Sequence, residues 1–315
     1  MNINKKVTLQ RIQTLTELHG APGFEEEVKN YMTQQMAPYV DEFIENRMGG
    51  FFGVKKSKNP NAKRVMIAAH MDEIGFMITN ITKNGMIQFT NLGGVANDIW
   101  QGQRLVIKNR NGDKIIGVVS NIPKHFRTGS EGAPEIKDLT LDIGAQNEDE
   151  VRERGIDIGD TIVPHTPFTQ LSEHRYSAKA SAEMIDPDVA FVVDCSPAND
   201  VKGNQPLSGE LGKGTLIRIK DGTMILKPVF RDYLLKLVEA HDIEHQYYMS
   251  PGGTDGGEIH KANIGIPTAV IGVCARYIHS TDSVFDIRDY FAARSLLSEA
   301  ICNLDNNQIE TLQYK

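Results

Sequence analysis

The fold is decided by the stretch Val65-Met66-Ile67-Ala68-Ala69-His70-Met71-Asp72-Glu73. Its first five residues form a short, unbroken apolar run. Such a run predicts a strand covered on both faces, as in a parallel sheet flanked by helices. Two further runs of this kind lie at Val189–Val193 and Thr268–Val273. Together the three runs predict the sheet of an α/β fold.

Helical patterns lie on either side of these runs. Residues 7–36 have apolar residues at helical spacing, with a break at Gly20-Ala21-Pro22-Gly23. Residues 233–241 and 290–304 also have the pattern of helices. Helices before and after the apolar runs agree with an α/β fold.

The segment between residues 74 and 170 has a different pattern. Short alternating stretches such as Arg104–Lys108 and Lys114–Val119 are separated by turn signals at Asn84-Gly85 and Asn111-Gly112. This pattern predicts a small all-β unit. We therefore expect an α/β domain formed by residues 1–73 and 171–315, with a β domain of residues 74–170 inserted in one loop.

Charge and composition narrow the function classes. The chain has 34 Lys and Arg residues against 41 Asp and Glu residues, a formal net charge of −7. This balance argues against a nucleic-acid binder. No apolar run approaches the roughly 18 residues of a membrane span, and the N-terminus lacks a signal-peptide pattern. Three scattered cysteines predict reduced thiols, so we expect a cytoplasmic protein without a membrane or nucleic-acid partner.

Polar residues follow the three apolar runs. They are His70, Asp194 and, six residues after the third run, His279. In open α/β sheets, ligands bind outside the carboxyl ends of the strands. Two imidazoles and a carboxylate suit Zn²⁺, Co²⁺ or Mn²⁺, and Asp72 could accept the ring N–H of His70. A single histidine after such a run is more often structural, but the agreement of three strand ends favours a metal site.

Four segments resemble the M42 family of dinuclear metallo-aminopeptidases, and bacterial glutamyl aminopeptidases in particular. They are Ala69–Phe76, Val193–Pro197, Gly252–Gly257 and Cys274–Ser280, and the likeness extends from Leu18–Glu25 to the final helix. The resemblance implies a zinc-peptidase-like α/β domain with an inserted small β-barrel-like domain. It also implies a cytosolic homo-oligomer, from dimers to tetrahedral dodecamers.

The resemblance also assigns roles to residues. His70 and Asp194 would bind one divalent metal ion, His279 would bind a second, and Asp72 would orient His70. The loop with Gly253, Thr254 and Asp255 would line the substrate cleft. In the family mechanism, a glutamate deprotonates a water that bridges the two metals, and this water attacks the N-terminal peptide bond. Arg276 is a candidate partner for an acidic substrate side chain, although arginine is as often structural.

The sequence departs from the family pattern after Ala180. The family has an Asp-Asp-Arg or Asp-Asn-Arg stretch whose first Asp bridges the metals, and later a Glu-Glu pair that supplies the general base and a metal ligand. Here Lys179-Ala180 leads directly into Ser181-Ala182. One helix and one strand of the family core are therefore expected to be absent after Ala180, and the general-base Glu is not found. Either the sequence omits a stretch or the chain is shortened.

Two functions remain open. The first is a metal-dependent aminopeptidase that removes N-terminal residues, with Glu and Asp as candidates, from short peptides. The alternative is a catalytically silent family member that acts as a binding or assembly subunit, with fewer metal ions or none. A carbohydrate hydrolase with paired carboxylates fits less well, because no acidic pair follows a core strand.

Overall fold

The computed structural model describes residues 4–121, 134–178, 188–203 and 206–314. The chain divides into two compact units. The first unit comprises Met1–Asn30, Asp72–Phe168 and His279–Asp282. The second comprises Tyr31–Met71, Thr169–Ile278 and Ser283–Lys315. We describe each unit separately.

The first unit contains a closed barrel. Its strands, in the order of their pairing, are β4 (Gly75–Ile81), β5 (Ile87–Leu92), β8 (Thr140–Asp142), β7 (Lys114–Val119), β6 (Arg104–Lys108) and β9 (Thr161–Pro164). Two predicted turns, at Gly85 and Gly112, have φ angles of +79° and +88°, which glycine adopts without steric cost. The barrel confirms the expected small β fold. A short 3-10 helix, η2 (Ile136–Asp138), and a helix, α3 (Glu148–Glu153), also belong to this unit.

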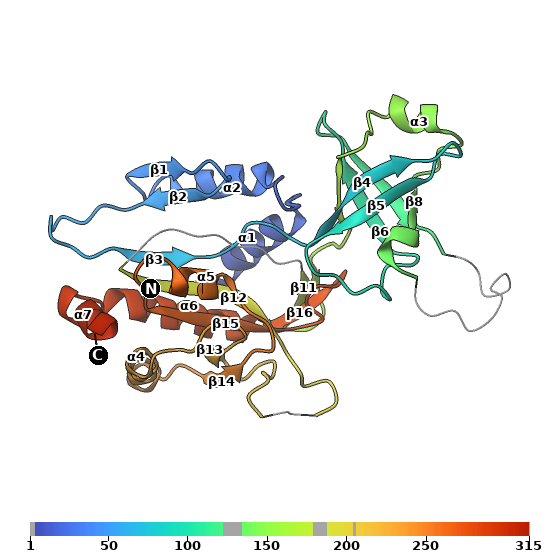
Figure 1. Cartoon of the computed structure of the whole chain (residues 1–315). Helices are drawn as coiled ribbons and strands as arrows, with labels where there is room; N and C mark the ends of the chain where they lie inside the picture. Colours follow the sequence, from blue (N-terminus) through green and yellow to red (C-terminus); the bar gives the residue numbers. More distant parts are fainter. Residues whose placement is uncertain (1–3, 122–133, 179–187, 204–205, 315) are drawn as a thin grey trace. The chain divides into compact units, whose positions relative to one another are not determined.

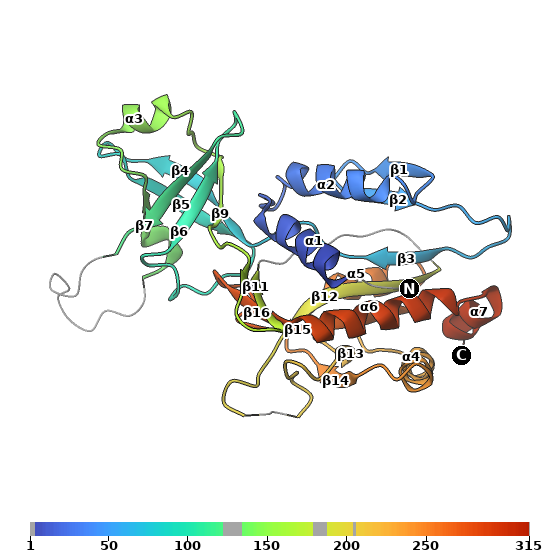
Figure 2. The ribbon, with the colours of Figure 1, turned by 180° about the vertical axis from the view of Figure 1, so that it is seen from behind.

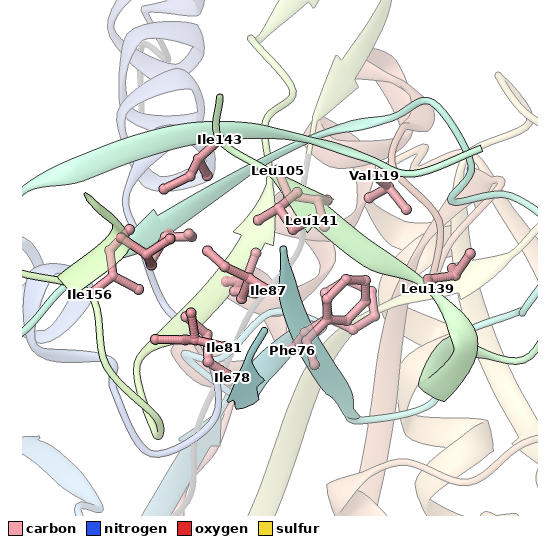
Figure 3. Packing of buried hydrophobic residues seen from close by; sticks show 14 of the residues in the cluster. Phe76, Ile78, Ile81, Ile87, Leu105, Val119, Leu139, Leu141, Ile143 and Ile156 are labelled. Carbon is pink, nitrogen blue, oxygen red and sulfur yellow. The ribbon is translucent and has the colours of Figure 1, made fainter. Parts of the chain in front are cut away.

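Alternate side chains of the strands fill the barrel. Figure 3 shows them pointing toward one another, among them Phe76, Leu105 and Leu141. The ring of Phe76 packs edge-on against Trp100 at a centroid distance of 4.7 Å. Trp100 is fully buried, and its ring N–H donates a hydrogen bond to the carbonyl of Ala96 at 2.6 Å. Trp100 therefore packs in the hydrophobic core of the barrel.

Two helices precede the first strands, as the sequence predicts. They are α1 (Lys5–Glu17) and α2 (Glu26–Met36), separated by the segment that contains Gly20–Gly23. Two further strands, β1 (Glu42–Glu45) and β2 (Phe51–Val54), pair with each other in an antiparallel hairpin.

The second unit contains a mixed sheet of eight strands within the described residues. Its core is β12 (Val189–Pro197), which pairs in parallel with β3 (Val65–Ala68) and with β15 (Thr268–Arg276). The three predicted strands are therefore neighbours, and the α/β fold is confirmed. The remaining strands are β10 (Thr169–Gln170), β11 (Arg175–Ala178), β13 (Thr215–Lys220), β14 (His245–Met249) and β16 (Ser283–Asp286).

Helices cover both faces of this sheet (Figures 1 and 2). On one face lie α4 (Pro228–Ala240), α6 (Ile287–Cys302) and α7 (Asn306–Tyr314). There Phe191 of β12 packs against Phe230 of α4 at a ring distance of 5.3 Å. On the other face lies α5 (Asp255–Lys261), whose Ile259 packs in one cluster with Val192. None of the helices in the described part of the chain is long and apolar enough to span a membrane.

Two expectations about the strands are wrong in detail. Strand β3 is not covered on both faces, because Val65 and Ile67 are 38% and 52% exposed. Strand β3 lies at the edge of the sheet within the described residues. The helices that cover its neighbour β12 therefore do not reach these two side chains. Strand β12 does not end before Asp194 but continues to Pro197, since β15 pairs with it along this whole length.

Candidate metal and substrate site

His70 and Asp194 meet at the carboxyl ends of neighbouring parallel strands. Ala68 and Val192 are directly opposite each other in the ladder, and each predicted ligand follows two residues later. The distance from Nε2 of His70 to Oδ1 of Asp194 is 3.9 Å. Their side chains are 40% and 20% exposed, so both remain open to a ligand. The sheet therefore brings together two of the three predicted metal ligands.

The pair has the geometry of two ligands on one ion. Zinc binds imidazole nitrogen and carboxylate oxygen at about 2 Å, so two ligands on one tetrahedral ion lie about 3–4 Å apart. The observed 3.9 Å fits this separation with a small adjustment. Within the described ranges, however, no group of three His, Cys, Asp or Glu side chains is arranged to hold a metal ion. His70 and Asp194 could therefore supply two of the ligands of a metal ion.

The charge state of Asp194 depends on its neighbours in the second unit. Burial raises the pKa of this carboxyl, and the nearby Asp255 also raises it. The guanidinium of Arg218 and the imidazole of His70, when it is protonated, oppose both effects, but the pKa of Asp194 remains raised overall. The Arg218 guanidinium therefore favours the anionic form that a metal requires, against the larger effect of burial.

Arg218 of β13 lies buried close to this carboxylate. Its side chain is 3% exposed, and Nη2 donates to Oγ of Ser196 at 2.7 Å. Nη1 donates to Oδ2 of Asp221 at 3.2 Å and lies 3.5 Å from the carbonyl oxygen of Gly252. The guanidinium carbon is 5.6 Å from the centre of the Tyr248 ring. One buried cation thus contacts the Asp194 strand and the glycine-rich loop.

The glycine-rich loop leads into α5 and packs on Thr223. Thr254 precedes this helix and Asp255 is its first residue. A Cβ atom at Gly253 would lie 2.5 Å from Cγ2 of Thr223, and one at Gly257 would lie 2.1 Å from its Oγ1. Glycine is therefore required at both positions by close packing. Gly253, Thr254 and Asp255 belong to the same unit as His70 and Asp194.

His279 and Asp72 belong to the first unit. His279 has a φ angle of +59° and Tyr277 one of +60°, both in the left-handed region. Such a conformation costs a non-glycine residue on the order of 1 kcal/mol or more and is frequent at functional sites. The carbonyl of Thr281 accepts a hydrogen bond from Thr166 Oγ1 at 2.6 Å. The approach of His279 and Asp72 to His70 stays a prediction.

Arg276 is already engaged by an acidic residue. Its Nε and Nη2 donate to Oδ1 and Oδ2 of Asp200 at 2.6 and 2.7 Å. Asp200 is 5% exposed and also accepts a hydrogen bond from the N–H of Leu211 at 3.1 Å. This bidentate pair favours the structural alternative for Arg276 over the recognition of an acidic substrate.

Burial disfavours the thiolate form of the two cysteines near the site. Burial raises the pKa of Cys195 to about 12, and the Asp194 charge adds to this effect. Burial also raises the pKa of Cys274 beyond its usual range. Both, like Cys302, are free thiols.

The sequence did not reveal the role of Arg218 or of Asp221. Arg218 stands among Leu216, Ile217 and Ile219 in an otherwise apolar strand. A single cation inside a buried strand must find a partner, since an unpaired buried charge is very costly. This pattern is the signal that would have pointed to a buried network.

The comparison with known protein families matches most of the chain. A model of the family described as M42 glutamyl aminopeptidase matches residues 49–180 and 175–296. The chain belongs to the M42 glutamyl aminopeptidase family. Its membership makes it a hydrolase of the aminopeptidase class.

Individual proteins resemble the chain over nearly its full length. A glutamyl aminopeptidase of Lactococcus lactis subsp. cremoris (strain MG1363) is 33% identical over 352 positions, covering 96% of this chain and 98% of the relative. The solved TET aminopeptidase from the marine sediment archaeon Thaumarchaeota archaeon SCGC AB-539-E09 has a TM-score of 0.91 and 28% identity, covering 98% of this chain and 100% of that one. The Pyrococcus horikoshii TET1 peptidase, described as able to assemble into a tetrahedron or a large octahedral shell, shares the fold, with a TM-score of 0.81, 21% identity and coverage of 93% and 98%.

The match to the M42 family is interrupted at one place. Its two parts overlap at residues 175–180 of this chain. The alignment with the Lactococcus protein spans 352 positions, more than the 315 residues of this chain, so the relative has residues without a counterpart here. The interruption coincides with the place where a family helix and strand are expected to be absent. The junction of Ala180 and Ser181 lies outside the described residues.

Proposed function

We propose that this chain is a metal-dependent aminopeptidase that removes N-terminal residues from short peptides. The observation that carries the proposal is the convergence of His70 and Asp194, 3.9 Å apart at neighbouring strand ends. An N/O donor pair in this position suits Zn²⁺, Co²⁺ or Mn²⁺. Membership of an aminopeptidase family supplies the reaction class.

We assign the following roles to the residues of this chain. His70 and Asp194 hold one metal ion, His279 holds a second, and Asp72 orients the ring of His70. Gly253, Thr254 and Asp255 line the peptide cleft. A bound ion would act as a Lewis acid that polarises the scissile carbonyl. The protein residues place the peptide, and the charge of Arg218 favours the ionised form of Asp194 against the effect of burial.

A release assay tests this proposal. Peptides with N-terminal Glu, Asp or Leu are incubated with the full chain and with Zn²⁺, Co²⁺ or Mn²⁺. The proposal requires release of the first residue that depends on added metal and is lost in His70→Ala. Absence of turnover for every peptide with every metal would end the aminopeptidase proposal for this chain.

A silent subunit is the second candidate. Two observations favour it: the family match is interrupted at residues 175–180, and the described residues hold no group of three metal-ligating side chains. A site with only two protein ligands binds a metal ion more weakly than a typical catalytic zinc site, which has three. Metal content near two ions per chain, measured by plasma mass spectrometry, would contradict this candidate, whereas content near zero would support it.

Three further features belong to the same proposal. We propose that residues 1–73 and 171–315 act as the α/β domain and residues 74–170 as the inserted domain. We also propose a homo-oligomer, because the Pyrococcus horikoshii relative is described as a tetrahedral or octahedral assembly. A cytoplasmic location accords with the free thiols.

A further inference from the structure

A buried arginine lies between the two parts of the candidate site that are held within one unit. Strand β15 separates β12 from β13, and Gly272 of β15 pairs with Asp194 on one side and with Leu216 on the other. Alternate residues of a strand share a face, so Ser196 and Arg218 lie on the same face of the sheet as Asp194. Arg218 therefore extends over β15 toward the Asp194 strand.

Position 272 leaves little room for a side chain. A Cβ atom there would lie 3.0 Å from Cβ of Leu216 and 3.2 Å from Oγ of Ser196. Glycine at this position leaves the space between Leu216 and Ser196 open. Nη2 of Arg218 then reaches Ser196 at 2.7 Å, two residues beyond Asp194.

The other end of the guanidinium supports the glycine-rich loop. Nη1 contacts Asp221, whose side chain is fully buried. Oδ1 of Asp221 accepts hydrogen bonds from the N–H of Thr223, its hydroxyl and the N–H of Met224, at 2.7, 2.8 and 2.9 Å. Thr223 is the residue on which Gly253 and Gly257 pack. The contacts therefore run without a break from the Asp194 strand to the loop.

We propose that Arg218 is the positioning residue of this site: it holds the Asp194 strand and the Gly252–Gly257 loop in one fixed relation, so that metal binding and peptide binding share one support. The planar guanidinium fixes the directions of two acceptors at once, which a lysine cannot do. The inference rests on the proposed function in one respect, namely that these two elements bind a metal and a peptide.

Three substitutions test the contacts of Arg218 with the strand and with the loop. Ser196→Ala removes the contact on the strand side, Asp221→Asn weakens the contact on the loop side, and Arg218→Met removes both. Arg218→Lys keeps the charge but loses the fork. Arg288→Met is the matched control, because Arg288 pairs with Asp286 of the same unit and does not contact either element of the site.

Calorimetric titrations of the full chain with Zn²⁺ and with the tripeptide Glu-Ala-Ala measure the two affinities. Losing an outer contact of a metal ligand typically weakens metal binding about 10- to 100-fold. We expect Ser196→Ala to weaken Zn²⁺ binding about tenfold and leave peptide binding within about twofold, and Asp221→Asn to do the reverse. Arg218→Met should weaken the binding of both Zn²⁺ and the peptide. Arg218→Lys should bind both more weakly than the wild-type chain, and Arg288→Met should leave both affinities unchanged.

Equal effects of Ser196→Ala and Asp221→Asn on both affinities would show a general structural role and overturn the proposal. So would wild-type affinities in Arg218→Lys. If Arg218→Met does not fold, the affinities of Ser196→Ala and Asp221→Asn test the proposal. If the wild-type chain binds no Zn²⁺, the peptidase proposal fails, and amide hydrogen exchange then decides the role of Arg218. Faster exchange at residues 194–197 and 251–257 in Arg218→Lys supports it, and unchanged exchange at both segments refutes it.

Discussion

At the scale of single residues, Glu27 shows how one carboxylate joins a helix to the barrel. Its Oε1 lies 3.1 Å from Nζ of Lys108, and its Oε2 lies 2.8 Å from Nζ of Lys114. Oε2 also accepts the N–H of His19 at 3.1 Å. Partial burial opposes ionisation of Glu27, but these hydrogen bonds outweigh it and lower the pKa to about 2.

Glu27→Gln should therefore lower stability in a pH-dependent way. An unfolded glutamate has a pKa of about 4.3, so the contribution is fully present above that value and is lost as the pH falls toward 2. We expect a loss of about 1 kcal/mol at pH 7 that shrinks at acid pH. Urea unfolding of both proteins between pH 7 and pH 3 measures it. The exposed Glu26→Gln is the control, and a difference that does not change with pH contradicts this explanation.

Arg276→Ala tests the pairing with Asp200. Removing the cation leaves a carboxylate that is 5% exposed without its bidentate partner, so we expect a loss of stability of about 2 kcal/mol. The ratio of the affinities for Glu-Ala-Ala and Leu-Ala-Ala should stay within about twofold, because the guanidinium is occupied. Calorimetry measures both affinities. A selective loss of Glu-Ala-Ala binding would contradict this explanation and indicate that Arg276 binds the acidic side chain of the substrate.

At the scale of elements, the glycine-rich loop allows a comparison of two adjacent glycines. A Cβ atom at Gly253 would collide with Thr223, whereas nothing lies within 4 Å of one at Gly252. We expect Gly253→Ala to lower stability by about 1–3 kcal/mol and Gly252→Ala to change it by less than about 0.5 kcal/mol. Thermal unfolding of both variants measures this. Thr223→Ala should partly rescue Gly253→Ala, and equal stabilities of the two single variants would contradict the packing argument.

The elements were largely predictable because local pattern and tertiary structure agree. The apolar runs at Val189–Val193 and Thr268–Val273 became adjacent parallel strands, and the Asn-Gly turns separate barrel strands. The exposure of Val65 and Ile67 was not predictable. An apolar run gives the strand, but its neighbours in the sheet decide which side chains are covered.

The candidate site was predictable only in part. His70 and Asp194 were found because parallel strands end at one edge of the sheet, so residues far apart in sequence meet there. The network of Arg218, Asp221 and Ser196 was not found. It depends on which strand lies between β12 and β13 and on the missing side chain of Gly272, and neither follows from local sequence pattern.

At the scale of the whole molecule, the mass in solution tests the proposed homo-oligomer. We expect light scattering after size exclusion to give a mass that is a multiple of the 35.0 kDa subunit mass. A species of 35.0 kDa across the micromolar range would contradict this expectation.

The account depends most on the proposed binding of divalent metal ions by His70, Asp194 and His279. Zinc titration of the wild-type chain and of His70→Ala, Asp194→Ala and His279→Ala tests this directly, with circular dichroism to confirm folding. We predict that each substitution weakens zinc binding at least about tenfold. Wild-type affinity in any one of the three folded variants would contradict the proposed centre.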